Sequence, residues 1–95
     1  MTPTNINETA CQANVEKIKV MSYISENGIP FDVTYKLVKL SVPDTMFMMI
    51  AESGDESEGV CLGNDEAKSR LIYSLVCEYG VMPGVLGETV KDIEV

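Results

Sequence analysis

The sequence predicts an α+β domain in which an antiparallel sheet of three or four strands is followed by two helices packed on one face. Three observations carry this prediction. Residues 17–62 contain short segments of alternating or continuous apolar residues, residues 64–80 contain a capped helical pattern, and Gly80 and Pro83 separate that pattern from a second helical segment. Strands that precede helices along the chain are typical of a two-layer α+β domain.

The length of the chain predicts one domain. Its 95 residues suffice for a single modest hydrophobic core. Residues 1–14 are polar and lack periodicity, so we expect a flexible leader there and a folded domain over residues 15–95.

The first two strands are predicted by a period of two residues. Ile18 and Val20 alternate with Lys17 and Lys19, and the lysines are expected to be solvent-side strand residues. Residues 25–28 read Ser-Glu-Asn-Gly, which predicts a tight hairpin turn because Asn-Gly accepts positive φ angles. Residues 31–37 alternate again, and a change of phase after Leu37 predicts a β-bulge.

The third strand is predicted to be central. Residues 46–51 are apolar on both faces, as in a strand that is buried on both sides. Residues 53–59 predict an acidic loop, and residues 60–62 predict a short edge strand in which Cys61 is a buried apolar residue.

The two helices are predicted from their ends and their apolar spacing. Asn64 is the expected N-cap of the first helix, and Gly80 is its expected end. Pro83 then opens a second, shorter helix. The apolar faces are expected to be Ala67, Leu71, Ile72, Leu75, Val76 and Tyr79 in the first helix, and Leu86, Val90 and Ile93 in the second.

Composition excludes several classes of partner. With 15 acidic and 7 basic residues, a net charge of −8 argues against binding to nucleic acid, which requires clustered basic side chains. No apolar stretch reaches the length of a membrane span, and the first fifteen residues lack the pattern of a secretory signal. We therefore expect a cytoplasmic protein with no membrane partner.

The sequence contains no recognisable catalytic or cofactor motif. There are three cysteines without CxxC spacing and no histidine, a combination that fits neither a disulfide framework nor a zinc site. The lack of histidine also excludes Ser-His and Cys-His pairs within the chain. We predict a protein that is not an enzyme, with no catalytic, cofactor-binding or metal-binding residue.

Two surfaces remain as candidate sites. Methionine is over-used at adaptable binding surfaces, so an apolar sheet face could hold a protein partner or a second copy of the chain. The residues assigned to this surface are Tyr35, Met46, Phe47, Met48 and Met49. The competing interpretation is that these side chains fill the core.

The second candidate is acidic. Glu52, Asp55, Glu56 and Glu58 could bind a divalent cation, although their spacing does not match an EF-hand and a solvated hairpin loop explains them equally. The predicted function is thus a protein-interaction or self-associating module. The alternative is a small-molecule or divalent-metal-binding regulatory module.

Residues 31–95 resemble a family of short uncharacterised proteins from Firmicutes that is classed as a domain of unknown function. The resemblance rests on Tyr35–Leu37, Phe47–Ile50, the acidic turn and short strand, the helix 65–79, and Val81–Pro83 leading into Leu86–Asp92. This chain departs from the pattern at Met82 and Gly84, on either side of the proline. The resemblance implies a bacterial protein with a small sheet-plus-helices fold, and it transfers no functional residue.

Overall fold

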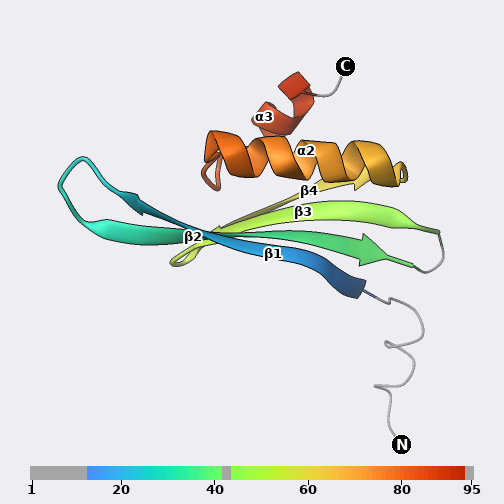
Figure 1. The fold of residues 1–95 in the computed structure, drawn as a ribbon, viewed down its shortest axis with the longest axis horizontal. Helices are drawn as coiled ribbons and strands as arrows, with labels where there is room; N and C mark the ends of the chain where they lie inside the picture. Colours follow the sequence, from blue (N-terminus) through green and yellow to red (C-terminus); the bar gives the residue numbers. More distant parts are fainter. Residues whose placement is uncertain (1–12, 42–43, 94–95) are drawn as a thin grey trace, which may run out of the picture.

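The described part of the chain forms one sheet and one helical layer. The computed structural model describes residues 13–41 and 44–93. Its elements are β1 (Ala13–Ile24), β2 (Pro30–Leu40), β3 (Met46–Ser53), β4 (Glu56–Gly63), α2 (Glu66–Tyr79) and α3 (Leu86–Ile93). The strands are antiparallel in the order β1-β2-β3-β4, and both helices lie on the same side of the sheet (Figure 1), which confirms the predicted fold class.

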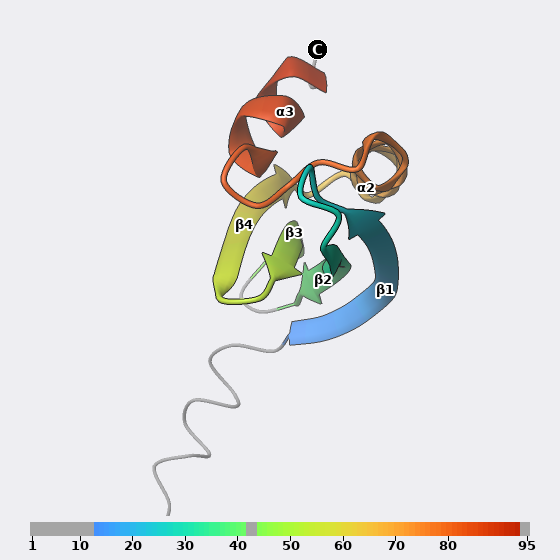
Figure 2. The ribbon, with the colours of Figure 1, turned by 90° about the vertical axis from the view of Figure 1, so that its left-hand side faces the viewer.

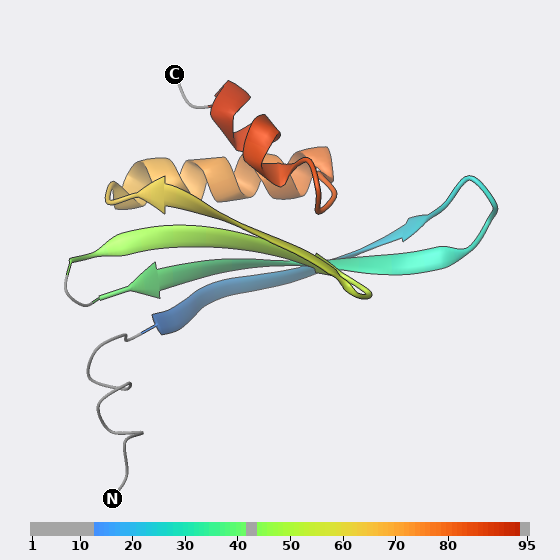
Figure 3. The same ribbon diagram turned by 180° about the vertical axis from the view of Figure 1, so that it is seen from behind.

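The predicted leader, residues 1–14, lies outside the described residues except for its last two. Ala13 and Asn14 are the first residues of β1, which is therefore longer than the sequence indicated. Cys11 belongs to the undescribed segment. β1 is an edge strand that curves along the sheet toward α2 (Figure 2), and its hairpin with β2 projects beyond the helices (Figure 3).

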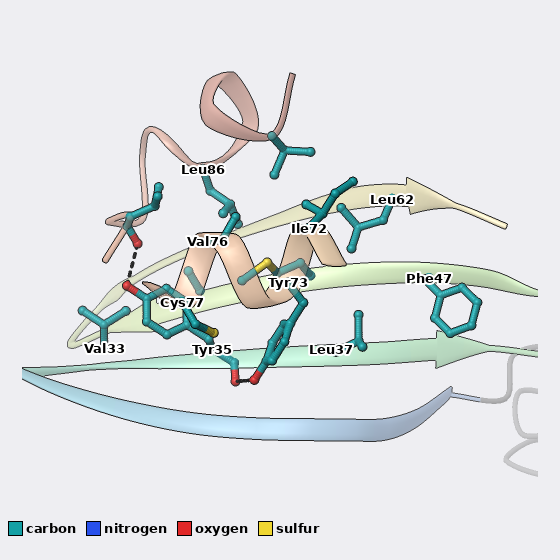
Figure 4. Packing of buried hydrophobic residues seen from close by; sticks show 14 residues of the cluster. Val33, Tyr35, Leu37, Phe47, Leu62, Ile72, Tyr73, Val76, Cys77 and Leu86 are labelled. Atoms are coloured by element: carbon teal, nitrogen blue, oxygen red, sulfur yellow. Dashed lines mark hydrogen bonds between the residues drawn. The ribbon is translucent and has the colours of Figure 1, made fainter. Parts of the chain in front are cut away.

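The core lies between the sheet and the helices (Figure 4). The sheet contributes Val33, Tyr35, Leu37, Phe47, Met49, Ala51 and Leu62, and the helical side contributes Ile72, Tyr73, Val76, Cys77, Val81, Leu86 and Val90. Burial of this apolar surface is the main source of the stability of a domain of this size.

Two tyrosines connect β2 to the segment that contains α2. The Tyr73 hydroxyl donates a hydrogen bond to the Tyr35 carbonyl oxygen at 2.9 Å, and the Tyr35 hydroxyl donates to the Val81 carbonyl oxygen at 2.8 Å (Figure 4). Burial raises the pKa of both phenols above its ordinary value. Because each buried hydroxyl has a partner, the two aromatic rings can lie in the core.

The buried face of α2 differs from the predicted one. Asp65, not Asn64, is the N-cap, since its carboxylate accepts a hydrogen bond from the Lys68 N–H at 3.0 Å. Leu71 and Tyr79, both expected in the core, are 59% and 63% exposed. The buried residues are instead Ser69, Ile72, Tyr73, Val76 and Cys77. Tyr73 lies on this buried face, where its hydroxyl donates a hydrogen bond to the Tyr35 carbonyl oxygen.

The predicted bulge in β2 is wrong, and the extra residue lies on the neighbouring strand. β2 pairs with β3 in continuous register through Leu37 and Val38. In β1, Glu16 is inserted between Val15, which pairs with Val38, and Lys17, which pairs with Leu37. The apolar residues of β2 change phase after Leu37 because Val38 lies on the face of the sheet opposite the helices. That face also carries apolar residues of the neighbouring strands.

The first hairpin turns at the predicted residues 25–28, where the Gly28 N–H donates a hydrogen bond to the Ser25 carbonyl oxygen at 2.9 Å. Only the conformation of Asn27 differs from the prediction, because Gly28 has a positive φ and Asn27 does not. The acidic segment 53–59 is mostly strand, because β4 begins at Glu56. The turn between β3 and β4 consists of Gly54 and Asp55 alone.

Glu58 joins β4 to α3. Its carboxylate accepts hydrogen bonds from the N–H groups of Gly84, Leu86 and Gly87 at 2.7, 2.8 and 3.0 Å. Burial acts to raise the pKa of Glu58, but these three donors outweigh it and the pKa lies below its usual value. A negative charge at a helix N-terminus is favourable, so this carboxylate fixes where α3 begins.

Candidate interaction surface

The face of the sheet opposite the helices, here called the far face, is an exposed apolar surface. The strand register places on it Ala13, Val15, Ile18, Val20, Ser22, Ile24, Pro30, Asp32, Thr34, Lys36, Val38, Leu40, Met46, Met48, Ile50, Glu52, Ser57, Gly59 and Cys61. Both helices lie on the other side of the sheet (Figures 1 and 3), and no helix or strand of residues 13–41 and 44–93 covers the far face.

The apolar side chains of the far face are open to solvent at the β1 edge. Val15, Ile18 and Val20 are 52%, 60% and 56% exposed, and Met46 on β3 is 38% exposed. Val38, in the middle of the face, is buried, and its cross-strand neighbours are Val15 and Met48. A contiguous exposed apolar patch on a small protein is typical of a binding surface.

Charge is sparse on the far face. One lysine and two carboxylates lie there, while the whole chain carries −8. Lys36 Nζ and Glu52 Oε1 form an ion pair at 3.0 Å, and Asp32 accepts a hydrogen bond from the Ser22 hydroxyl at 2.7 Å. The acidic excess of the chain is therefore located elsewhere, and the far face is almost neutral.

The sheet divides the five residues that the sequence assigned to an interaction surface. Tyr35, Phe47 and Met49 face the helices and are buried in the core. Met46 and Met48 lie on the far face. Strand alternation imposes this division, because successive side chains of one strand point to opposite faces. The apolar surface here consequently consists of exposed Met46 and half-buried Met48 together with far-face residues of β1.

The four acidic candidates do not converge. Glu52 pairs with Lys36 on the far face, while Glu58 binds the backbone before and within α3. Asp55 lies in the turn, and Glu56 begins β4. Among the residues that the structure describes, no three Asp, Glu, Cys or His side chains gather closely enough to hold a metal ion.

Cys61 is exposed, contrary to the prediction of a buried thiol. It lies on the far face directly opposite Met48, and its Sγ is 3.9 Å from Met46 Sδ. Three sulfur-containing side chains therefore share one corner of this face. The sequence alone did not reveal the group, because Cys61 and Met46 are 15 residues apart and become neighbours only through the β3–β4 register.

A cavity of about 310 Å³ lies between β1 and α2, on the helical side of the sheet. Lys17, Lys19, Tyr73, Ser74 and Cys77 are among its lining residues. Burial raises the pKa of the Cys77 thiol, and this effect exceeds the opposing effects of Tyr73 and the two lysine charges. The thiol is therefore protonated at neutral pH and is a poor nucleophile.

No described helix combines the length and the apolar character that a membrane crossing requires. Comparison of the chain with protein-family models, with curated proteins and with solved structures yields no match in any of the three. The resemblance to the Firmicutes family of unknown function thus stays a prediction.

Proposed function

We propose that this protein is a non-enzymatic module that self-associates, and that two copies pack against each other through their far faces. The observation that carries the proposal is the apolar surface formed by exposed Val15, Ile18 and Val20 on β1 and by exposed Met46 and half-buried Met48 on β3. Burial of apolar surface stabilises an interface by about 25 cal/mol per Å² before the costs of association are subtracted.

The distribution of charge allows a second copy as the partner. Two chains of net charge −8 repel each other, and with salt screening this repulsion is smallest when the facing surfaces carry little charge. The far face meets this condition, since Lys36 and Glu52 neutralise each other there. A two-fold symmetric interface uses the same patch on both chains, so an almost neutral apolar face is complementary to itself.

The size of the face predicts a weak dimer. Four strands spaced about 4.8 Å apart, paired over about eight residues of roughly 3.3 Å each, cover about 500 Å² per chain. Stable complexes typically bury about 800 Å² per partner. We therefore expect reversible association with a dissociation constant on the order of micromolar.

Replacement of one exposed valine tests the proposal. Val20→Lys adds a charge to an exposed edge-strand position, where a change of side chain has little effect on stability. Two such lysines would lie unpaired in a symmetric interface, so the dissociation constant is expected to rise at least about a hundredfold. Sedimentation equilibrium over a range of protein concentrations measures this change.

Leu71→Lys is the matched control. Leu71 is also an exposed apolar residue, 59% against 56% for Val20, but it lies on α2 rather than on the far face. This variant should associate like the unmodified chain. A full-length chain that stays monomeric at high concentration contradicts the proposal. If deletion of residues 1–12 then produces a dimer, that segment is the occupant of the face in the full-length chain.

A further inference from the structure

We propose that Met46, Met48 and Cys61 form a binding site for a soft monovalent cation, Cu(I). The three residues lie together on the far face at the corner formed by the start of β3 and the end of β4. Thiolate and thioether sulfurs are soft ligands, and Cu(I) is one of the metals that they favour. The proposal does not depend on self-association.

The spacing of two of the sulfurs fits coordination to one ion. Cys61 Sγ and Met46 Sδ are 3.9 Å apart. A metal–thiolate bond is about 2.3 Å long in zinc sites, and at that length two sulfurs in a trigonal or tetrahedral site are roughly 3.8 to 4.0 Å apart. The two side chains already have the separation that a shared ion would impose, so little reorganisation is needed.

Met48 supplies the third sulfur. It is the direct cross-strand partner of Cys61, so the two side chains leave the sheet on the same face. Its terminal methyl lies beside Gly59, at an ordinary contact distance of 3.5 Å from the position that a Cβ atom would take there. Methionine has three rotatable side-chain bonds, so rotation can turn the Met48 sulfur toward Cys61.

The chemistry of the three ligands favours Cu(I) over Zn²⁺. One thiolate and two neutral thioethers give a soft donor set that balances a single positive charge, whereas zinc sites are built from thiolates, imidazoles and carboxylates. The chain contains no histidine. On binding, a sulfur–copper bond forms as the Cys61 S–H bond breaks, and the proton passes to water because Cys61 is exposed. The oxidation state of copper does not change.

Anaerobic titration with Cu(I) against a chromophoric chelator tests the site on the full-length chain. One ion per chain is expected. Since even outer-shell changes typically weaken metal sites about 10- to 100-fold, Cys61→Ser should reduce affinity at least about a hundredfold, and Met46→Leu and Met48→Leu about tenfold each. Met21→Leu, which changes a methionine on the helical side of the sheet, should leave affinity unchanged.

Two results would overturn the proposal. If Cys61→Ser binds as tightly as the unmodified chain, the ion is elsewhere; if neither Met→Leu change weakens binding, a thiol alone holds it. Val20→Lys, which should lose association, lies on β1 and is not one of the three sulfur ligands, so it should bind Cu(I) as tightly as the unmodified chain. Unchanged copper affinity in a chain that no longer dimerises separates this site from the association that Val20→Lys tests. Far-ultraviolet circular dichroism verifies that each variant is folded.

Discussion

Gly80 has two functions at the end of α2. It adopts φ +67°, the left-handed conformation that closes the helix, and its N–H is hydrogen-bonded to the carbonyl groups of Val76 and Cys77. A Cβ atom at this position would lie 2.9 Å from the Tyr23 hydroxyl oxygen, which is itself 3.4 Å from that of Tyr35. The absence of a side chain therefore allows β1, β2 and the helix end to meet.

Gly80→Ala is expected to destabilise the fold by about 2 to 3 kcal/mol, of which about 1 to 2 kcal/mol is the cost of the left-handed conformation and the remainder is displacement of Tyr23. Gly28→Ala is the control, because Gly28 also has a positive φ, +80°, but nothing lies within 4 Å of its added Cβ. Urea denaturation measures both. Equal losses in the two variants would show that contact with Tyr23 is unimportant.

Among the elements, α3 depends most on a contact from another part of the chain. It has eight residues, too few for a helix to be stable alone in water. Leu86 and Val90 bury its apolar face, and the Glu58 carboxylate binds the N–H groups of Gly84, Leu86 and Gly87 at its start. The helix therefore forms where β4 places a negative charge.

Glu58→Ala should lower the free energy of unfolding by about 1 to 2 kcal/mol, because three hydrogen bonds to a partly exposed charged group are lost. Glu56→Ala removes an exposed carboxylate from the same strand and should change it by less than about 0.5 kcal/mol. Hydrogen exchange should show faster exchange in α3 of the Glu58 variant. Unchanged protection there would contradict this role.

The same elements show which parts of the fold are predictable from the sequence. The two-residue and helical periods located every strand and both helices, since those patterns are local. They did not identify which face of residues 46–51 is covered, because both faces are apolar and the choice depends on pairing with β2 and β4. The sequence predicts that Glu58 lies in a loop. Its hydrogen-bond partner Leu86 in α3 is 28 residues later in the chain, so the contact becomes visible only in the folded structure. The sulfur group at Cys61 is hidden for the same reason.

For the whole molecule, the two buried phenols make the free energy of unfolding depend on pH in the alkaline range. Tyr35 and Tyr73 have an ordinary pKa of 10.0 when unfolded, and burial raises the pKa of both in the folded chain. The folded state thus holds their protons more tightly than the unfolded state. Their contribution to stability is complete below pH 10 and decreases as the pH rises above it.

The expected slope is a loss of about 1.4 kcal/mol per pH unit for each of these tyrosines once the unfolded state has ionised. Tyr73→Phe removes one of the two ionisations, so stability should fall less steeply above pH 10 even though the variant is less stable at pH 7. Urea denaturation between pH 8 and 11.5 measures the slopes. Parallel curves for both chains would exclude Tyr73 as a source of the effect.

The inserted residue Glu16 has a consequence for what the protein can assemble into. Among residues 13–41 and 44–93 no strand pairs with the outer side of β1, and an unpaired strand edge can add further strands and grow into fibrils. Glu16 interrupts the regular ladder, and its carboxylate is held 3.1 Å from Arg70 Nη2, while Lys17 and Lys19 follow immediately. Irregularity and repeated positive charge both oppose the docking of an incoming strand. Both features therefore disfavour polymerisation along the β1 edge. Association through two far faces would instead stop at two chains, because each far face would then be covered.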